Sequence, residues 1–482
     1  MRTELGIGTR SQTIEIDDAE LIEVMHANAV EAEKPGEGLV RDALSSPVGT
    51  ARLKDIVHPG QKVCLIASDC TRPCPTPELL TPVMQELHEA GIPNKDVFVA
   101  IALGSHRPQT EEELAHIMGP WKGKLAVVNG STSFRHFGTT KAGTPVDIIE
   151  EVADADVRVG LGNVEYHYFA GYSGGAKAIM PGCSTFEAIQ ANHSLMLSPE
   201  AHAGNMESPV RLDLEEACRM VGLDFIVNVV LDEDRHIVYA AAGDFVAAQR
   251  DACHHLDDLY GCELHEEADI VVVSQGGSPK DLNLYQLQKA LDNAKHPVRD
   301  GGTIVLVGSC QEGFGQPTFE QWMREAATPH EVVERLKKTF VLGGHKAAAV
   351  AQIEERCDIY LVSDMPDAEV RAAFMTPFAT AQEALDAARA KTLRELGRAP
   401  RILVMPHGGS TLPLMRLSPH HSRQRMRPLW ILSPERLFMR LLFLATSPIH
   451  MPTLRMLCSI FMRLPTLRRL LFWRSLIISG LL

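Results

Sequence analysis

Short apolar runs, each followed by a turn and a helix-like stretch, recur along most of this 482-residue chain. The runs lack the apolar–polar alternation of a half-exposed strand, which indicates strands buried on both faces. Such strands alternating with helices predict an α/β fold with mostly parallel sheets. The expected strands cover residues 63–67, 97–102, 157–161, 225–230, 268–274, 303–307, 359–362 and 402–405.

The helix patterns between these runs are less regular. Near the start of the chain, residues 13–16 alternate like a strand, and residues 17–28 are expected to form a helix capped by Asp17 or Asp18. A capping box, Thr110 with Glu113, predicts another helix start. Further helices are expected at residues 213–222, 244–260, 330–339 and 381–396.

Composition excludes several classes of protein. The net charge of −14 argues against a nucleic acid partner. Ten cysteines without CxxC pairs indicate neither a cysteine-rich zinc site nor a disulfide framework. The first residues lack the apolar core of a signal peptide. A cytoplasmic location fits these features best.

Residues 160–196 concentrate the unusual side chains of the chain. They hold two histidines, His167 and His193, one lysine, Lys177, and several glycines, two of them adjacent. Glycines allow positive φ and close backbone approach to a ligand. A glycine-rich turn between a strand and a helix is how α/β proteins build anion sites.

Standard motifs do not account for this stretch. Lys177 lies between two alanines, so the hydroxyl that a P-loop places on magnesium is missing. Gly160-Leu-Gly162 lacks the third glycine of a dinucleotide fingerprint. His167 and His193 are too far apart for a helical zinc pair.

Polar residues also follow two earlier strands. Asp69, Thr71 and Arg72 come directly after the strand at 63–67, and His106 follows the next strand along the chain. The carboxyl ends of parallel strands are where α/β folds bind ligands, and arginine can bind a carboxylate bidentately. Taken alone, a stiff loop with a local Asp–Arg pair and a solvated histidine explains the same residues.

A fourth group lies at the start of an expected helix near residue 284. Gln286 and Lys289 are three residues apart and therefore share one helical face, and Tyr285 precedes them. The pattern is typical of an exposed polar face and equally of a ligand-binding one.

These strings together resemble the nickel-pincer lactate racemase family. The resemblance is carried by His-Tyr-Phe-Ala-Gly-Tyr-Ser-Gly-Gly-Ala-Lys at 167–177 and by Ala-Asn-His-Ser at 191–194. It is supported by Asp-Cys-Thr-Arg-Pro-Cys-Pro at 69–75, Gly-Ser-His-Arg at 104–107 and Tyr-Gln-Leu-Gln-Lys at 285–289. Five motifs in order along the chain are a far more specific signal than one.

The resemblance implies a racemase or epimerase of a lactate-like 2-hydroxy acid that works by reversible hydride transfer. It implies nickel and a pyridinium-3,5-bisthiocarboxylate mononucleotide, covalently bound to Lys177, with His193 as the nickel ligand. Cofactor-making enzymes would be partners, and His106 and His167 would be the acid/bases. The other implied roles are cofactor binding by Asp69, Thr71 and Arg72 and substrate binding by Arg72, Tyr285, Gln286 and Lys289.

The resemblance covers about residues 10–414, with Ala176 where an arginine is commoner. Because the implied site draws on both halves, two α/β domains are expected, at 1–265 and 266–414, with the site in the cleft between them. Neither the hydroxy acid nor the oligomeric state follows from these motifs.

Two other functions stay open. A zinc-dependent hydrolase could use His106, His167 and His193 as metal ligands. A non-catalytic phosphate- or nucleotide-binding protein could use Lys177 only as an electrostatic clamp.

Residues 415–482 break the pattern of the rest of the chain. They hold eleven arginines, no lysine and a single acid, Glu435. Charge-free runs such as 441–454 are too short for a membrane span, and Pro448 interrupts that one. The composition favours translation out of frame past the normal end over an arginine-rich membrane anchor.

Overall fold

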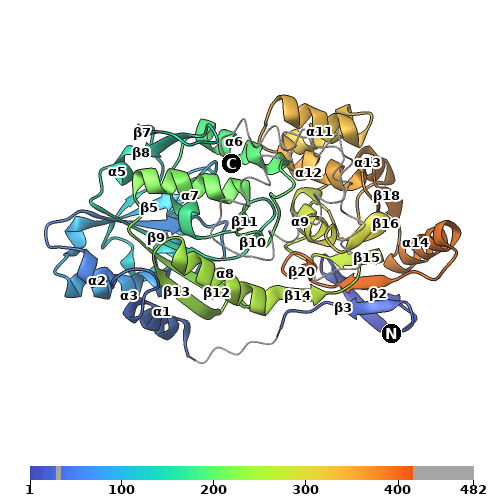
Figure 1. Cartoon of the computed structure of the whole chain (residues 1–482), viewed down its shortest axis with the longest axis horizontal. Helices are drawn as coiled ribbons and strands as arrows, with labels where there is room; N and C mark the ends of the chain where they lie inside the picture. Colours follow the sequence, from blue (N-terminus) through green and yellow to red (C-terminus); the bar gives the residue numbers. More distant parts are fainter. Residues whose placement is uncertain (29–33, 416–482) are drawn as a thin grey trace, which may run out of the picture. The chain divides into compact units, whose positions relative to one another are not determined.

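The structure is a computed structural model that describes residues 1–28 and 34–415 (Figure 1). These residues belong to one compact unit, Met1–Arg416. Apart from Met415, the basic tail at 415–482 lies outside the described residues. Among the helices that the structure describes, none has the length and apolar content needed to cross a bilayer.

The first sheet has the strand order β13-β12-β9-β4-β5-β6 and is parallel except at the edge strand β13. Both of its faces are buried: Leu65 and Ala67 point into one apolar cluster, and Cys64 and Ile66 point into another. This explains the unbroken apolar runs of the sequence. The strands are β4 (Val63–Ser68), β5 (Val97–Ala102), β6 (Ala126–Val128), β9 (Val157–Asn163), β12 (Phe225–Leu231) and β13 (Ile237–Gly243).

The second sheet has the order β18-β17-β16-β15-β19-β3 and is parallel throughout. The expected α/β fold with mostly parallel sheets is therefore confirmed. The strands are β3 (Leu21–Val24), β15 (Ala268–Ser274), β16 (Val298–Val307), β17 (Asp358–Val362), β18 (Thr376–Phe378) and β19 (Ile402–Met405).

The helix expected at residues 17–28 is wrong. Leu21–Val24 form β3, which completes the edge of the second sheet beside β19. Backbone hydrogen bonds fix it there, from Ile402 N to Glu20 O at 2.8 Å and from Met25 N to Val404 O at 2.8 Å. An open sheet edge offers backbone partners that a local helix pattern cannot reveal. In Figure 1 this blue segment lies among the yellow and orange elements of the second sheet.

The helices expected at residues 213–222, 244–260, 330–339 and 381–396 are confirmed within a few residues. The capping box at Thr110 is also present. The confirmed helices are α7 (Pro209–Val221), α8 (Ala247–Tyr260), α11 (Pro329–Lys338) and α14 (Ala381–Leu396). The other helices are α1 (Gly36–Ser45), α2 (Leu53–Ile56), α3 (Thr76–Glu89), α4 (Glu111–Met118), α5 (Glu150–Ala153), α6 (Phe186–Ser194), α9 (Leu284–Ala294), α10 (Pro317–Glu325), α12 (Gly344–Glu354) and α13 (Asp367–Ala372).

Four two-stranded sheets complete the fold, and one of them forms part of the candidate site. That one pairs β10 (Tyr166–His167) with β11 (Gly171–Tyr172). The others are β1 (Arg2–Ile7) with β2 (Arg10–Glu15), β7 (Phe134–Thr139) with β8 (Pro145–Ile149), and β14 (Gly261–Leu264) with β20 (Leu412–Met415).

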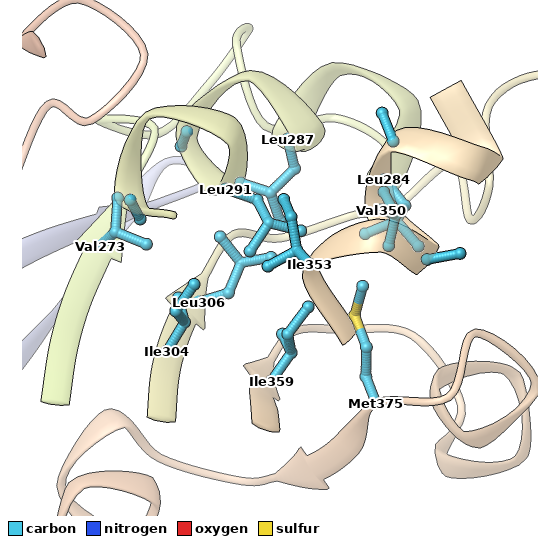
Figure 2. Close-up of a cluster of buried hydrophobic side chains, with 14 of the residues drawn as sticks. Val273, Leu284, Leu287, Leu291, Ile304, Leu306, Val350, Ile353, Ile359 and Met375 are labelled. Carbon is cyan, nitrogen blue, oxygen red and sulfur yellow. The ribbon is translucent and has the colours of Figure 1, made fainter. Parts of the chain in front are cut away.

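Helix α9 is held on the second sheet by a strip of leucines. Leu284, Leu287 and Leu291 are fully buried in one apolar cluster; Leu291 lies toward Leu306 of β16, and Leu284 lies beside Val350 of α12 (Figure 2). Burying each such side chain contributes about 1.5–3 kcal/mol. Tyr285, Gln286 and Lys289 of the same helix are less buried than these leucines.

Candidate active site

The turn after β4 is organised by the carboxylate of Asp69, which is only 3% exposed. Its Oδ1 accepts hydrogen bonds from Thr71 Oγ1 at 2.7 Å and from Thr71 N at 3.2 Å. The carbonyl of Asp69 accepts a further bond from Arg72 N at 3.1 Å. The turn thereby presents the exposed side chains of Thr71 and Arg72 at the carboxyl edge of the first sheet.

His106 lies next to this turn, after the neighbouring strand β5. Its Nδ1 is hydrogen-bonded to Asp69 Oδ2, while its side chain stays 43% exposed. Burial alone would raise the pKa of Asp69, but hydrogen bonds from His106 and Thr71 and the charge of Arg72 lower it below the ordinary value. An ionised partner at Nδ1 fixes the ring and leaves Nε2 for proton exchange.

His167 sits in the hairpin between β10 and β11. The backbone N–H of Ala170 lies 3.3 Å from its Nδ1, and the ring of Phe169 lies between the two histidines of this region. Ring centroids are 4.5 Å apart for His167 and Phe169 and 4.8 Å apart for Phe169 and His193. Burial, reinforced by the charge of Lys177, lowers the pKa of both histidines. Both rings are therefore neutral near pH 7.

Lys177 follows a glycine turn that no other residue could form. Gly174 has φ +72°, and a Cβ there would lie 2.5 Å from Asn228 Oδ1. The same oxygen accepts a hydrogen bond from Gly175 N at 2.8 Å, which ties the turn to β12. Burial lowers the pKa of Lys177, and the charges of Arg72 and Arg211 act in the same direction. The amine is therefore shifted toward its neutral, nucleophilic form.

Arg211 on α7 links the histidine hairpin to the lysine turn. Its guanidinium donates to the carbonyls of Ala170 at 3.4 Å, Gly174 at 3.2 Å and Tyr172. The side chain is fully buried, and burial lowers its pKa to about 10. One planar group with fixed donors thus sets the relative position of His167 and Lys177.

The second sheet contributes the first turn of α9. Asn283 caps the helix by accepting a hydrogen bond from Gln286 N at 3.0 Å. Tyr285 and Gln286 are half-buried and Lys289 is exposed. Although part of its side chain is exposed, reduced hydration lowers the pKa of Lys289. The charge of Arg72 also lowers this pKa, and the charge of Glu165 raises it.

Tyr168 connects the two groups of residues. Its ring stacks on His167, with centroids 5.4 Å apart, and lies 6.4 Å from the ring of His345 on α12. Lys346 Nζ lies 5.9 Å from the Tyr168 ring centroid and 4.0 Å from that of Tyr285. The structure therefore brings residues of the two sheets to one place, where the charge of Arg72 acts on His167, Lys177 and Lys289.

The zinc alternative lacks the ligand set it requires. Within residues 1–28 and 34–415, no group of three or more His, Cys, Asp or Glu side chains could hold a metal ion. His106 is bonded to Asp69 and His193 packs against Phe169, so these histidines do not converge on one point.

Residues 7–204 match the lactate racemase N-terminal domain, and residues 264–412 match the C-terminal domain. The lactate racemase of Lactiplantibacillus plantarum is 30% identical over 419 residues, which cover 84% of this chain and 98% of that protein. This chain belongs to the lactate racemase family. Racemases are isomerases, so the match also gives the class of reaction that the family catalyses.

Two further relatives agree with this membership. The lactate racemase of Thermoanaerobacterium thermosaccharolyticum is 30% identical over 424 residues, covering 85% of this chain and 98% of that protein. The solved apoprotein structure of the lactate racemase from that organism superposes with a TM-score of 0.78 at 28% identity, covering 86% of this chain and all of that one.

Sequence reasoning missed two residues that shape the site, Arg211 and Asn228, and gave no role to a third, Lys346. Arg211 and Asn228 lie in an ordinary helix and an ordinary strand, and their partners in the 170–175 turn are remote in sequence, so no local signal marks them. A sequence signal did mark Lys346 as a possible site residue, because it follows two glycines and His345. Asp69, Thr71 and Arg72 follow β4 and His106 follows β5, as the strand-end argument expected.

Proposed function

We propose that this protein racemises or epimerises a lactate-like 2-hydroxy acid, with His106 and His167 as the acid/base pair. The observation that carries the proposal is that these two histidines, in motifs shared with the lactate racemase family, have different surroundings. His106 is bonded to the ionised Asp69, and His167 is buried and neutral. In both rings Nδ1 makes the contact with the protein, which leaves Nε2 for proton exchange.

The residues fit the cofactor that the family resemblance implies. Lys177 offers a buried amine with a lowered pKa, which suits a covalent thioamide link. His193 offers a neutral imidazole, the form that binds metals. When bound, the nickel-pincer nucleotide supplies an acceptor for the hydride of the carbinol carbon.

Proton transfer is the task of the protein side chains. His106 Nε2 would take the hydroxyl proton of one enantiomer, and the carboxylate of Asp69 would stabilise the imidazolium that forms. His167 would serve the other enantiomer. Because burial disfavours its charged form, a protonated His167 gives up its proton readily.

The anionic groups are held by cations from both sheets. Arg72 and Lys289 would bind the substrate carboxylate or the cofactor phosphate, with Asp69 and Thr71 shaping the turn that carries Arg72. The first turn of α9 would add Tyr285 and Gln286 to the substrate contacts.

We also propose the domain boundary near residue 265 and a cytoplasmic location, with cofactor-making enzymes as partners. The domain boundary is supported by the division of the strands between two six-stranded sheets. The exception is β3, which comes from the N-terminal part of the chain and joins the second sheet. Nine cysteines within the described part of the chain are free, which suits a reducing compartment.

The test is co-expression with cofactor-making enzymes, followed by intact mass, metal content and chiral chromatography with each lactate enantiomer. A mass adduct, nickel and conversion of either hand to a mixture are expected. A fully loaded protein that converts no 2-hydroxy acid would contradict the proposal. Zinc with hydrolytic turnover would support the hydrolase alternative.

A further inference from the structure

Lys346 is a nearly buried lysine that the proposed mechanism leaves without a role. It lies in the first turn of α12 and is 6% exposed. Its Nζ donates a hydrogen bond to the carbonyl of Tyr285 at 2.8 Å and lies over the ring of the same residue. The ring centroid of Tyr168, the residue after His167, lies 5.9 Å from the same amine. Lysines are rarely this buried without an anionic partner.

The amine of Lys346 has hydrogen-bond donors that its described surroundings do not use. Two aromatic faces attract an ammonium group. An ammonium carries three donors, and among the described residues one acceptor, the Tyr285 carbonyl, is bonded to it. Asp292 is a buried acid whose charge acts on Lys346. Its Oδ1 is paired with Lys295 at 2.7 Å, and its Oδ2 has no hydrogen-bond partner among the described residues, Lys346 included.

A second lysine lies one helical turn away. Lys289 is four residues after Tyr285, so both residues share the α9 face that the Lys346 side chain approaches. Burial lowers the pKa of Lys346, and the charge of Lys289 acts in the same direction. Two ammonium groups repel each other unless an anion lies between them.

We propose that Lys346 is a further substrate-binding residue, which holds the carboxylate of the hydroxy acid together with Lys289. This inference rests on the proposed function and refines it, because Arg72 is then left for the anionic groups of the cofactor. Tyr285 becomes a positioning residue, since its ring and its carbonyl fix the amine of Lys346.

The test compares Lys346→Gln and Lys346→Arg with Lys337→Gln, an exposed lysine on α11 paired with Glu334. Binding of oxamate, a small unreactive carboxylate, is measured by calorimetry on the full chain, and thermal unfolding checks the fold. Losing a charged hydrogen bond should weaken oxamate binding about 10- to 100-fold in Lys346→Gln. Lys346→Arg should retain most of the affinity, and Lys337→Gln should match the wild type.

The cofactor-loaded enzyme gives a second measurement. Lys346→Gln should raise KM for the hydroxy acid by a similar factor, with a smaller change in kcat. Wild-type affinity for oxamate in Lys346→Gln would overturn the proposal. So would equal losses in the Gln and Arg variants with a lowered Tm, because these indicate a packing role. If no 2-hydroxy acid is racemised but oxamate binding still depends on Lys346, the carboxylate site stands and the proposed function fails.

Discussion

The two catalytic histidines of the proposed mechanism stand in opposite surroundings. His106 lies in an exposed turn and contacts an ionised carboxylate, Asp69. His167 lies in a hairpin between aromatic rings, where burial lowers its pKa. The surroundings of His106 stabilise a positive charge on the ring, and those of His167 disfavour it. Two groups that serve mirror-image substrates therefore need not be chemically equivalent.

The buried region also carries the residues that fit the cofactor. Lys177 and His193 share the hydrophobic surroundings of His167, and Arg211 ties the hairpin to the lysine turn. The exposed region carries proton transfer and anion contacts only. Substitutions in the buried region should therefore have the larger effects.

The largest effect is expected for Lys177→Ala, which should remove the covalent adduct from the intact mass and abolish detectable racemisation. The reason is that no other lysine occupies the glycine turn. His193→Ala should keep the organic adduct but lose nickel. Lys337→Ala, at an exposed lysine on α11, is the control and should retain both the adduct and the nickel. An unmodified Lys177 in a fully active preparation would refute the assignment.

The second-largest effect is expected when either acid/base histidine is replaced. His106→Gln and His167→Gln should each lower turnover by about 10²–10⁴-fold in both directions, because racemisation needs both half-reactions. The half-reactions should differ: in each cofactor-loaded variant, the absorbance of the bound cofactor should change with one pure enantiomer and not with the other. Stopped-flow mixing with each hand measures this.

The preference should be opposite in the two variants. If both respond equally to either enantiomer, the two-sided assignment is wrong, and one of the histidines serves structure only.

Asp69→Asn should have an intermediate effect confined to the exposed region. Partners that orient a functional histidine are typically worth about 10–100-fold in activity. We expect a loss of this size together with a changed pH profile, since a neutral amide in place of the carboxylate could no longer stabilise an imidazolium on His106. An unchanged pH profile would show that Asp69 only shapes the turn.

Stability should also depend on Asp69 in a defined pH window. Its folded pKa lies below the ordinary value of 3.8, so ionised Asp69 stabilises the fold above that pH. The stabilisation is lost as the pH falls through the folded pKa. The difference in Tm between wild type and Asp69→Asn should therefore shrink below about pH 4. A difference that stays constant down to about pH 2 would contradict this.

The smallest effect is expected for truncation after Met415, which removes the arginine-rich tail and keeps β20. Neither histidine region uses the tail in the proposed mechanism, so kcat, KM and Tm should match those of the full chain. Loss of soluble protein would show that the composition argument about the tail is wrong.

The sequence predicted those parts of the molecule in which local pattern and topology agree. Asp69, Thr71, Arg72 and His106 could be placed because buried apolar runs marked the strands, and parallel strands end at one edge. The helix at 17–28 failed because β19, which pairs with this segment, lies at the far end of the described chain. Arg211 was missed for a similar reason: its carbonyl partners lie in another element.

The pairing of β3 with β19 has a consequence for the order of synthesis. All strands of the first sheet have been made once the ribosome passes Gly243, the end of β13. The edge of the second sheet must wait, because about 380 residues separate β3 from β19. At roughly 5–20 residues per second, β3 precedes its partner by on the order of 20–80 s. This N-terminal strand is thus among the first to leave the ribosome and one of the last to find its neighbour.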